Sequence, residues 1–158
     1  MRKFMKLLIS LLALIICMLL LAFSQIDQTS VAAFKFHPNI AWRKHSVVRG
    51  DFSCNGKTEL AILGLKESEI IVAVFMNGIT KPPILLRDSS KYRDSNTVEL
   101  SIEDGEFDEK DFQEMLGDIP DGLKSSKTCK WLRLSDGKID SAHIYWNRTT
   151  KSFGTWSL

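Results

Sequence analysis

The stretch "ELAILGLKESEIIVAVFM", residues 59–76, has the pattern of two consecutive β-strands. It holds two apolar runs, Glu59–Leu65 and Glu69–Met76, separated by the polar connection KESE at 66–69. Each run has the length of a strand rather than of a helix, and short polar connections of this kind join antiparallel neighbours. We therefore predict a β-hairpin over these residues.

Short apolar runs bounded by turn residues continue on both sides of this hairpin. The connection MNGIT, 76–80, contains an Asn-Gly pair, which favours another hairpin turn. By the same criteria we predict strands at 46–52, 83–86, 97–102, 129–136, 141–148 and 152–158. The predicted fold is mainly β, a small antiparallel β-sandwich or open barrel with one short helix, preceded by an N-terminal signal or hydrophobic helix.

The short helix is predicted inside an acidic segment that runs from Glu103 to Lys127. Its apolar residues share one helical face from about Asp108 to Leu116, and Gly117 and Pro120 end the pattern. The segment is either a recognition patch for a basic partner or a solvated connection whose apolar residues cover the sheet. Under the first interpretation the partner-binding candidates are Glu103, Asp104, Glu106, Asp108 and Asp111.

The N-terminus has the pattern of an export signal. Three basic residues in MRKFMK precede a run without charge from Leu7 to Ser24. This run is either a signal peptide, cleaved after small residues at 22–24 or at 31–33, or a retained membrane anchor. In both cases residues 25–158, predicted as a single domain, reach the periplasm or the cell exterior. The segment from 25 to 44 has no clear period and is predicted as a lead-in with a short strand near Ala41–Arg43.

The charge balance and the cysteine count limit the function and the covalent structure further. Without residues 1–24 the chain has 18 basic and 19 acidic residues, and no basic cluster that indicates nucleic-acid binding. Cys54 and Cys129 are the two cysteines that remain, and an even pair in an oxidising compartment predicts a disulfide. Closing so long a loop stabilises a fold by about 4 to 5 kcal/mol on the chain-entropy model.

The loop before the first hairpin strand, GDFSCNGKTELAILG at 50–64, has oxygen-bearing side chains at alternate positions. Calcium prefers six to eight oxygen ligands from a flexible loop with a glycine at the sharp turn. Position twelve is Ile62 where an EF-hand needs glutamate, so an EF-hand is excluded. The stretch is either a calcium loop or a tight turn that Cys54 holds in place.

The same stretch resembles the calcium loop of FG-GAP or VCBS-like repeats, which occur in the propeller of integrin α chains and in secreted bacterial proteins. The run ELAILG then corresponds to the strand that leaves the loop. The resemblance implies a Ca²⁺ ion with ligands from Asp51, Ser53, Asn55, the carbonyl of Lys57, and Glu59. The C-terminal stretch HIYWNRTTKSFGTWSL, 143–158, is also similar to small uncharacterised exported proteins of Gram-negative bacteria, which implies no activity.

Catalysis is not expected. His37, His45 and His143 are isolated from one another and form no paired metal-ligand spacing, and the sequence has no nucleophile motif such as Gly-x-Ser-x-Gly. We therefore expect an exported, non-catalytic binding domain whose partner is a protein or a cell-envelope glycan. The alternative is an inhibitor or immunity-type protein that blocks a secreted hydrolase with its acidic segment. Membrane contact is expected only through residues 1–24, if they stay attached.

Overall fold

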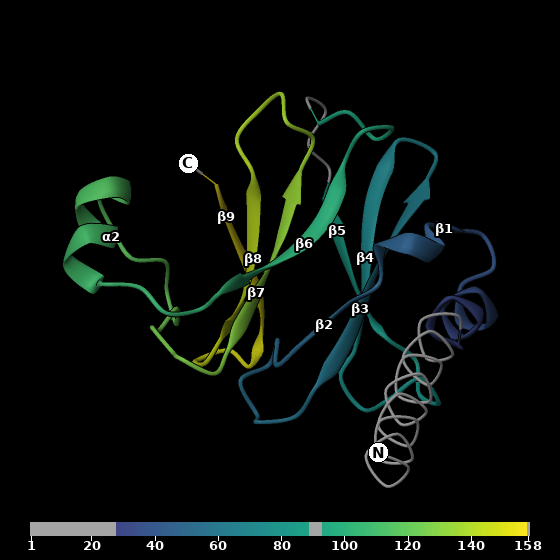
Figure 1. The fold of residues 1–158 in the computed structure, drawn as a ribbon, viewed down its shortest axis with the longest axis horizontal. Coiled ribbons are helices and arrows are strands. Elements are labelled where there is room, and N and C mark those ends of the chain that lie inside the picture. Colours follow the sequence, from purple (N-terminus) through teal and green to yellow (C-terminus); the bar gives the residue numbers. More distant parts are fainter. Residues whose placement is uncertain (1–27, 89–92, 158) are drawn as a thin grey trace, which may run out of the picture.

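The computed structural model describes residues 28–88 and 93–157, which form two antiparallel β-sheets packed face to face (Figure 1). The first sheet has the order β1–β3–β4–β5, with β2 also paired to β3, and the second has the order β6–β7–β8–β9. The strands are β1 Ala41–Trp42, β2 Val48–Gly50, β3 Glu59–Lys66, β4 Glu69–Phe75, β5 Ile84–Asp88, β6 Glu99–Asp104, β7 Lys130–Ser135, β8 Ala142–Asn147 and β9 Ser152–Ser157. These described strands do not close into a barrel, so the predicted sandwich is confirmed.

The predicted hairpin forms the centre of the first sheet. Strands β3 and β4 pair from Leu60 with Phe75 to Lys66 with Glu69, which leaves a two-residue connection. Glu67 in this connection has a φ of 56°, the conformation that tight hairpin turns require. The hairpin is buried on both faces, which explains why its apolar runs are continuous instead of alternating with polar residues.

The central core fills the space between the two sheets. Alternate residues of β3 and β4 point into it, and the second sheet adds residues from β6, β7 and β8. Its buried members are Phe52, Ala61, Leu63, Ile70, Val72, Val74, Val98, Leu100, Leu132, Leu134 and Ile144. This core fixes the register of the strands, because a shift by one residue would turn each apolar set to the wrong face.

Residues 28–36 are helical, and here the prediction of an irregular lead-in was wrong. The helix packs on the outer face of the first sheet, where Ala32 and Ala33 contact a cluster that includes Ile62 and Phe75. Small alanine side chains allow the helix to lie close to the sheet. No clear hydrophobic period is visible in this segment, because the helix also carries apolar residues on its other side. The predicted short strand follows as β1, and a 3₁₀ turn at Lys44–Ser46, η1, leads to β2.

The predicted acidic helix is confirmed as α2, Glu109–Leu116. The Asp108 carboxylate caps it by accepting hydrogen bonds from the backbone N–H groups of Lys110 and Asp111. Gly117, with a φ of 87°, ends it. Phe112 and the segment that follows pack with Trp131 and Tyr145 on the outer face of the second sheet. The two helices therefore cover opposite outer faces of the sandwich (Figure 1).

The predicted export segment, 1–24, and its cleavage sequence at 22–24 lie outside the described residues. The second cleavage sequence, 31–33, lies within the first helix, where Ala33 is fully buried. Across 28–88 and 93–157, no helix has both the length and the apolar character needed to cross a membrane.

Candidate functional site

The predicted calcium loop connects β2 to β3, two neighbouring antiparallel strands. Gly50 at the end of β2 lies opposite Glu59 at the start of β3, so residues 51–58 form a closed turn between them. Two residues turn the chain with positive φ, Cys54 at 56° and Gly56 at 78°. The prediction of a glycine at the sharp turn is confirmed by Gly56. The left-handed conformation of Cys54 was not predicted from the sequence.

The carboxylate of Glu59 lies at the centre of this loop, with only 1% of the residue exposed. Its Oε2 accepts a hydrogen bond from the Ser53 backbone N–H at 2.9 Å, and its Oε1 accepts one from the Ser53 hydroxyl. The Asn55 side-chain amide donates to the same Oε1 at 3.0 Å and to the Ser53 hydroxyl oxygen at 2.7 Å. Three of the predicted ligand residues therefore meet in one network.

The other two candidates close the loop from its outer side. The Asp51 carboxylate accepts hydrogen bonds from the backbone N–H groups of Asn55, at 2.9 Å, and Gly56, at 2.8 Å. The Lys57 backbone N–H donates to the side-chain oxygen of Asn55 at 2.8 Å. All five residues predicted as ligands thus belong to one compact turn, with Lys57 joined through its main chain.

The electrostatics of Glu59 are unusual for a carboxylate at neutral pH. Burial raises its pKa above the ordinary value of 4.5, and the negative charge of Asp51 raises it further, against lowering by the Ser53 hydrogen bonds. Among the described residues no basic side chain forms an ion pair with Glu59. A cation next to Glu59 would offset the cost of burying its charge.

The chemistry of this donor set fits a calcium ion. It comprises two carboxylates, a hydroxyl and an amide, all of which carry the oxygen atoms that calcium prefers. Each carboxylate oxygen can accept two hydrogen bonds, so Glu59 Oε1 is filled by Ser53 and Asn55, whereas each Asp51 oxygen accepts only one of the hydrogen bonds described above. The described residues hold no group of three or more His, Cys, Asp or Glu side chains suited to a metal.

A disulfide joins this loop to the second sheet, as the sequence predicted. Cys54 in the loop is bonded to Cys129, which directly precedes β7, with 4.9 Å between their Cα atoms. A backbone hydrogen bond of 3.0 Å from the Lys130 N–H to the Asp51 carbonyl adds a second link. The loop therefore couples the two sheets at one end of the sandwich.

The acidic candidates for partner binding are mostly engaged within the chain. Three of them form ion pairs: Glu103 with Arg133 at 3.5 Å, Asp104 with Lys130, and Glu106 with Lys127 at 3.6 Å. Glu103 also forms a hydrogen bond of 2.7 Å with Nδ1 of His143. The fourth, Asp108, is the cap of α2 described above. The fifth, Asp111, is exposed in the first turn of α2. Of these five residues, three are paired within the chain, one caps the helix, and Asp111 is exposed.

Two polar clusters were not found from the sequence. In the first, the buried Arg93 guanidinium binds the Asp88 carboxylate at 2.9 Å and the carbonyls of Leu134 and Asp140. In the second, on the outer face of the second sheet, the His143 ring stacks on Trp156 with 3.9 Å between ring centroids. Both clusters bring together residues from different strands. The sequence shows the pattern along each single strand but not which residues of different strands become neighbours.

Comparison with known proteins found no match: no protein-family model, no curated protein and no solved structure is similar to the chain at a significant level.

Proposed function

We propose that this chain is an exported, non-catalytic binding domain in which a calcium ion stiffens the loop between β2 and β3. One observation carries the proposal: the Glu59 carboxylate is 1% exposed, has no basic partner among the described residues, and contacts two of the other predicted ligands, Ser53 and Asn55. A buried, unpaired carboxylate with a raised pKa is costly at neutral pH, and calcium would supply the missing positive charge.

The residues that would hold the ion are Asp51, Ser53, Asn55, Glu59 and the carbonyl of Lys57. The ion would supply charge and rigidity, not reaction chemistry. The disulfide supports the assignment to the periplasm or cell exterior, because disulfides persist in oxidising compartments. A stiff loop that links the two sheets would hold the sandwich as a rigid scaffold for binding.

For the partner, the exposed side of α2 is the surface we assign to a basic protein. Asp111 and Met115 are four residues apart and therefore share one face of the helix, and Met115 is 54% exposed. A hydrolase inhibitor would use this same face, but the ion pairs of Glu103, Asp104 and Glu106 reduce the free charge of the segment. We therefore prefer the more general binding role.

Thermal melting of the oxidised protein, in millimolar calcium and then in chelator, tests the proposal. A ligand that binds only the folded state raises stability by about 2.7 kcal/mol at a hundred times its dissociation constant. We expect calcium to raise the melting midpoint of the wild type and not of Asp51→Asn. Asparagine removes the charge and keeps an oxygen for only one of the N–H groups of Asn55 and Gly56, because two different Asp51 oxygens accept these hydrogen bonds. Superimposed wild-type curves would contradict the proposal.

A further inference from the structure

The outer side of the helix at 28–36 is apolar although it faces away from the sheet. Val31 is 63% exposed and Phe34 is 61% exposed, whereas Ala32 and Ala33 are buried against the sheet. A surface helix in a globular protein usually presents polar residues outward, and a helix that is apolar on all sides indicates further burial. This side of the helix therefore has the character of a contact surface.

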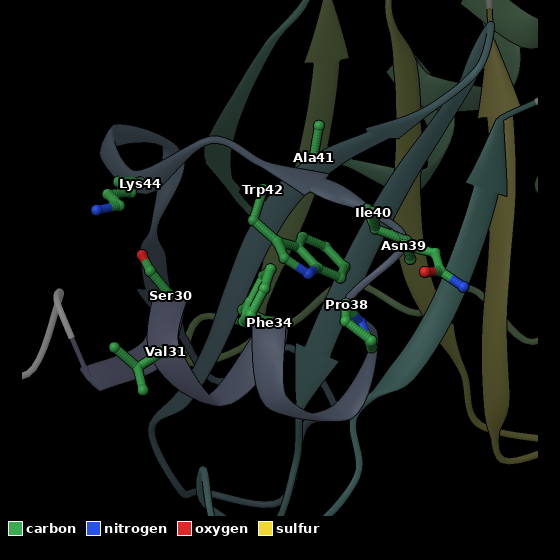
Figure 2. A pocket seen from close by; sticks show the side chains of 9 residues that line it. All are labelled: Ser30, Val31, Phe34, Pro38, Asn39, Ile40, Ala41, Trp42 and Lys44. Atoms are coloured by element: carbon green, nitrogen blue, oxygen red, sulfur yellow. The ribbon is translucent and has the colours of Figure 1, made fainter.

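A groove lies between this exposed side and the chain that leads into β1. It has a volume of about 610 Å³, and Val31, Phe34 and Trp42 provide apolar parts of its lining. Figure 2 shows the Phe34 and Trp42 rings along the groove, with Lys44 at a margin. An apolar hollow with aromatic side chains and a lysine at its edge has the composition of a surface that meets the lipid interface.

The charge of this region fits an anionic surface. Residues 28–50 contain four basic residues, Lys35, Arg43, Lys44 and Arg49, and no acidic residue, whereas 51–158 contain 14 basic and 18 acidic residues. Lys35, one position after Phe34, is exposed, as is Lys44. Each basic residue near an anionic lipid surface contributes about 1 kcal/mol of attraction. The positive part of the domain is thus the part that carries the apolar groove.

The position of the groove in the chain identifies its occupant. The uncharged run Leu7–Ser24 has the minimum length of a membrane-spanning segment. Val31 lies seven residues beyond Ser24, a chain length of at most about 25 Å. An anchor in the bilayer would therefore hold the groove at a high effective concentration of lipid. A weak apolar contact is sufficient under that condition.

We propose that Leu7–Ser24 remains attached as an anchor and that the groove of Val31, Phe34 and Trp42 lies on the surface of an anionic phospholipid bilayer. Lys35 and Lys44 then face the lipid phosphates. This contact orients the sandwich on the membrane, with one sheet toward the bilayer. It does not depend on calcium, because the loop at 51–59 contributes no residue to the groove.

Fluorescence quenching by lipids tests this placement in the full chain. The protein is reconstituted into vesicles of phosphatidylglycerol and phosphatidylethanolamine, with or without bromine on the acyl chains. The sequence has four tryptophans, and the other three, Trp131, Trp146 and Trp156, belong to the second sheet. We expect bromine to remove the emission of one tryptophan, Trp42→Phe to abolish this quenching, and the matched control Trp146→Phe to retain it.

A second variant covers the case in which Trp42→Phe disturbs the fold, since the Trp42 indole donates a hydrogen bond to the His37 carbonyl. Phe34→Ser changes an exposed side chain and keeps all four tryptophans; we expect it to reduce the quenching several-fold. Equal quenching in wild type and both variants, or none in the wild type, would overturn the proposal. A third result would also overturn the proposal: Trp42 emission that does not respond to bromine but changes with protein concentration in detergent. The groove would then be a contact between two copies of the chain.

Discussion

At the scale of single residues, Glu59 is the most informative position in the chain. It begins β3, lies opposite Gly50, and places its carboxylate in the middle of the loop. Its burial raises its pKa, so the folded state binds a proton more tightly than the unfolded state does. The contribution of a raised carboxylate pKa to stability is complete below the ordinary value of 4.5 and is lost as the pH rises through the folded value.

This sign gives a prediction for Glu59→Gln in chelator. The wild type should lose stability from this group as the pH rises from acid to neutral, because the ionised carboxylate is buried without a cation. The variant has no charge to bury and should show a smaller loss. Urea unfolding at a series of pH values measures the free energies. Parallel pH profiles of wild type and variant would show that Glu59 does not titrate as the structure implies.

The sequence was sufficient to predict which residues form the loop. It was not sufficient to predict their hydrogen bonds or their burial. Alternating oxygen side chains and Gly56 pointed to the turn and to the five candidates. The spacing could not reveal that the Asn55 amide donates to Glu59, because this depends on side-chain rotation within the folded loop. Nor could it reveal how deeply Glu59 is buried, since that requires the neighbouring strand.

At the scale of elements, strand boundaries were predictable because glycine, asparagine, aspartate and proline stand at their ends. Asp108 and Gly117 likewise bounded α2, and the structure assigns to them the two caps of that helix. The helix at 28–36 was missed because Val31 and Phe34 lie on one side and Ala32 and Ala33 on the other, so no single apolar stripe was visible. The helix is stabilised by burial of its alanine side against the sheet, although its sequence lacks the usual helical pattern.

The contact between β1 and β3 gives a prediction for Gly64→Ala. A Cβ atom at this position would lie 2.5 Å from Ile40 and 2.5 Å from Trp42, closer than side chains pack. Trp42 lies opposite Gly64 in the sheet, so neither side chain can move without shifting β1. We expect a loss of about 1–3 kcal/mol, as for other overpacked sites. Chemical denaturation measures it, with Gly78→Ala as a control in a turn where nothing lies within 4 Å.

Gly78 has a φ of 78°, so alanine there carries backbone strain but no clash. Gly78→Ala therefore measures the cost of strain without a clash, and Gly64→Ala measures the cost of a clash without that strain. If Gly64→Ala were as stable as the wild type, the close packing of Trp42 on β3 would be wrong.

In the whole molecule, several contacts join the two sheets. The central core fills the space between them, and the disulfide joins the loop after β2 to the chain before β7. Arg93 bridges Asp88 of β5 to the carbonyls of Leu134 in β7 and of Asp140 in the connection between β7 and β8. The sequence predicted the disulfide from the cysteine count. The sequence could not predict the Arg93 bridge, because the partners of Arg93 lie 5 to 47 residues from it along the chain and meet only in the fold.

Arg93→Met tests the contribution of this bridge. The Arg93 side chain is 3% exposed, and its removal leaves the carbonyls of Leu134 and Asp140 without their donor. Because the Asp88 carboxylate is 18% exposed, we expect a loss between about 1 kcal/mol and the roughly 3–5 kcal/mol of a fully buried ion pair. Arg87→Met is the matched control, because its pair with Glu69 is exposed and should cost less than about 1 kcal/mol. Equal costs in urea unfolding would show that Arg93 does not join the sheets.

Calcium titration by calorimetry measures binding at the loop between β2 and β3. We expect the oxidised wild-type protein to bind one calcium ion per chain. Binding should weaken as the pH falls toward the raised pKa of Glu59, because the proton and the ion compete for the same carboxylate. Asp51→Asn should bind more weakly. If the folded wild type showed no binding heat at several temperatures, the loop would not be a calcium site but a turn held by its own hydrogen bonds and the disulfide.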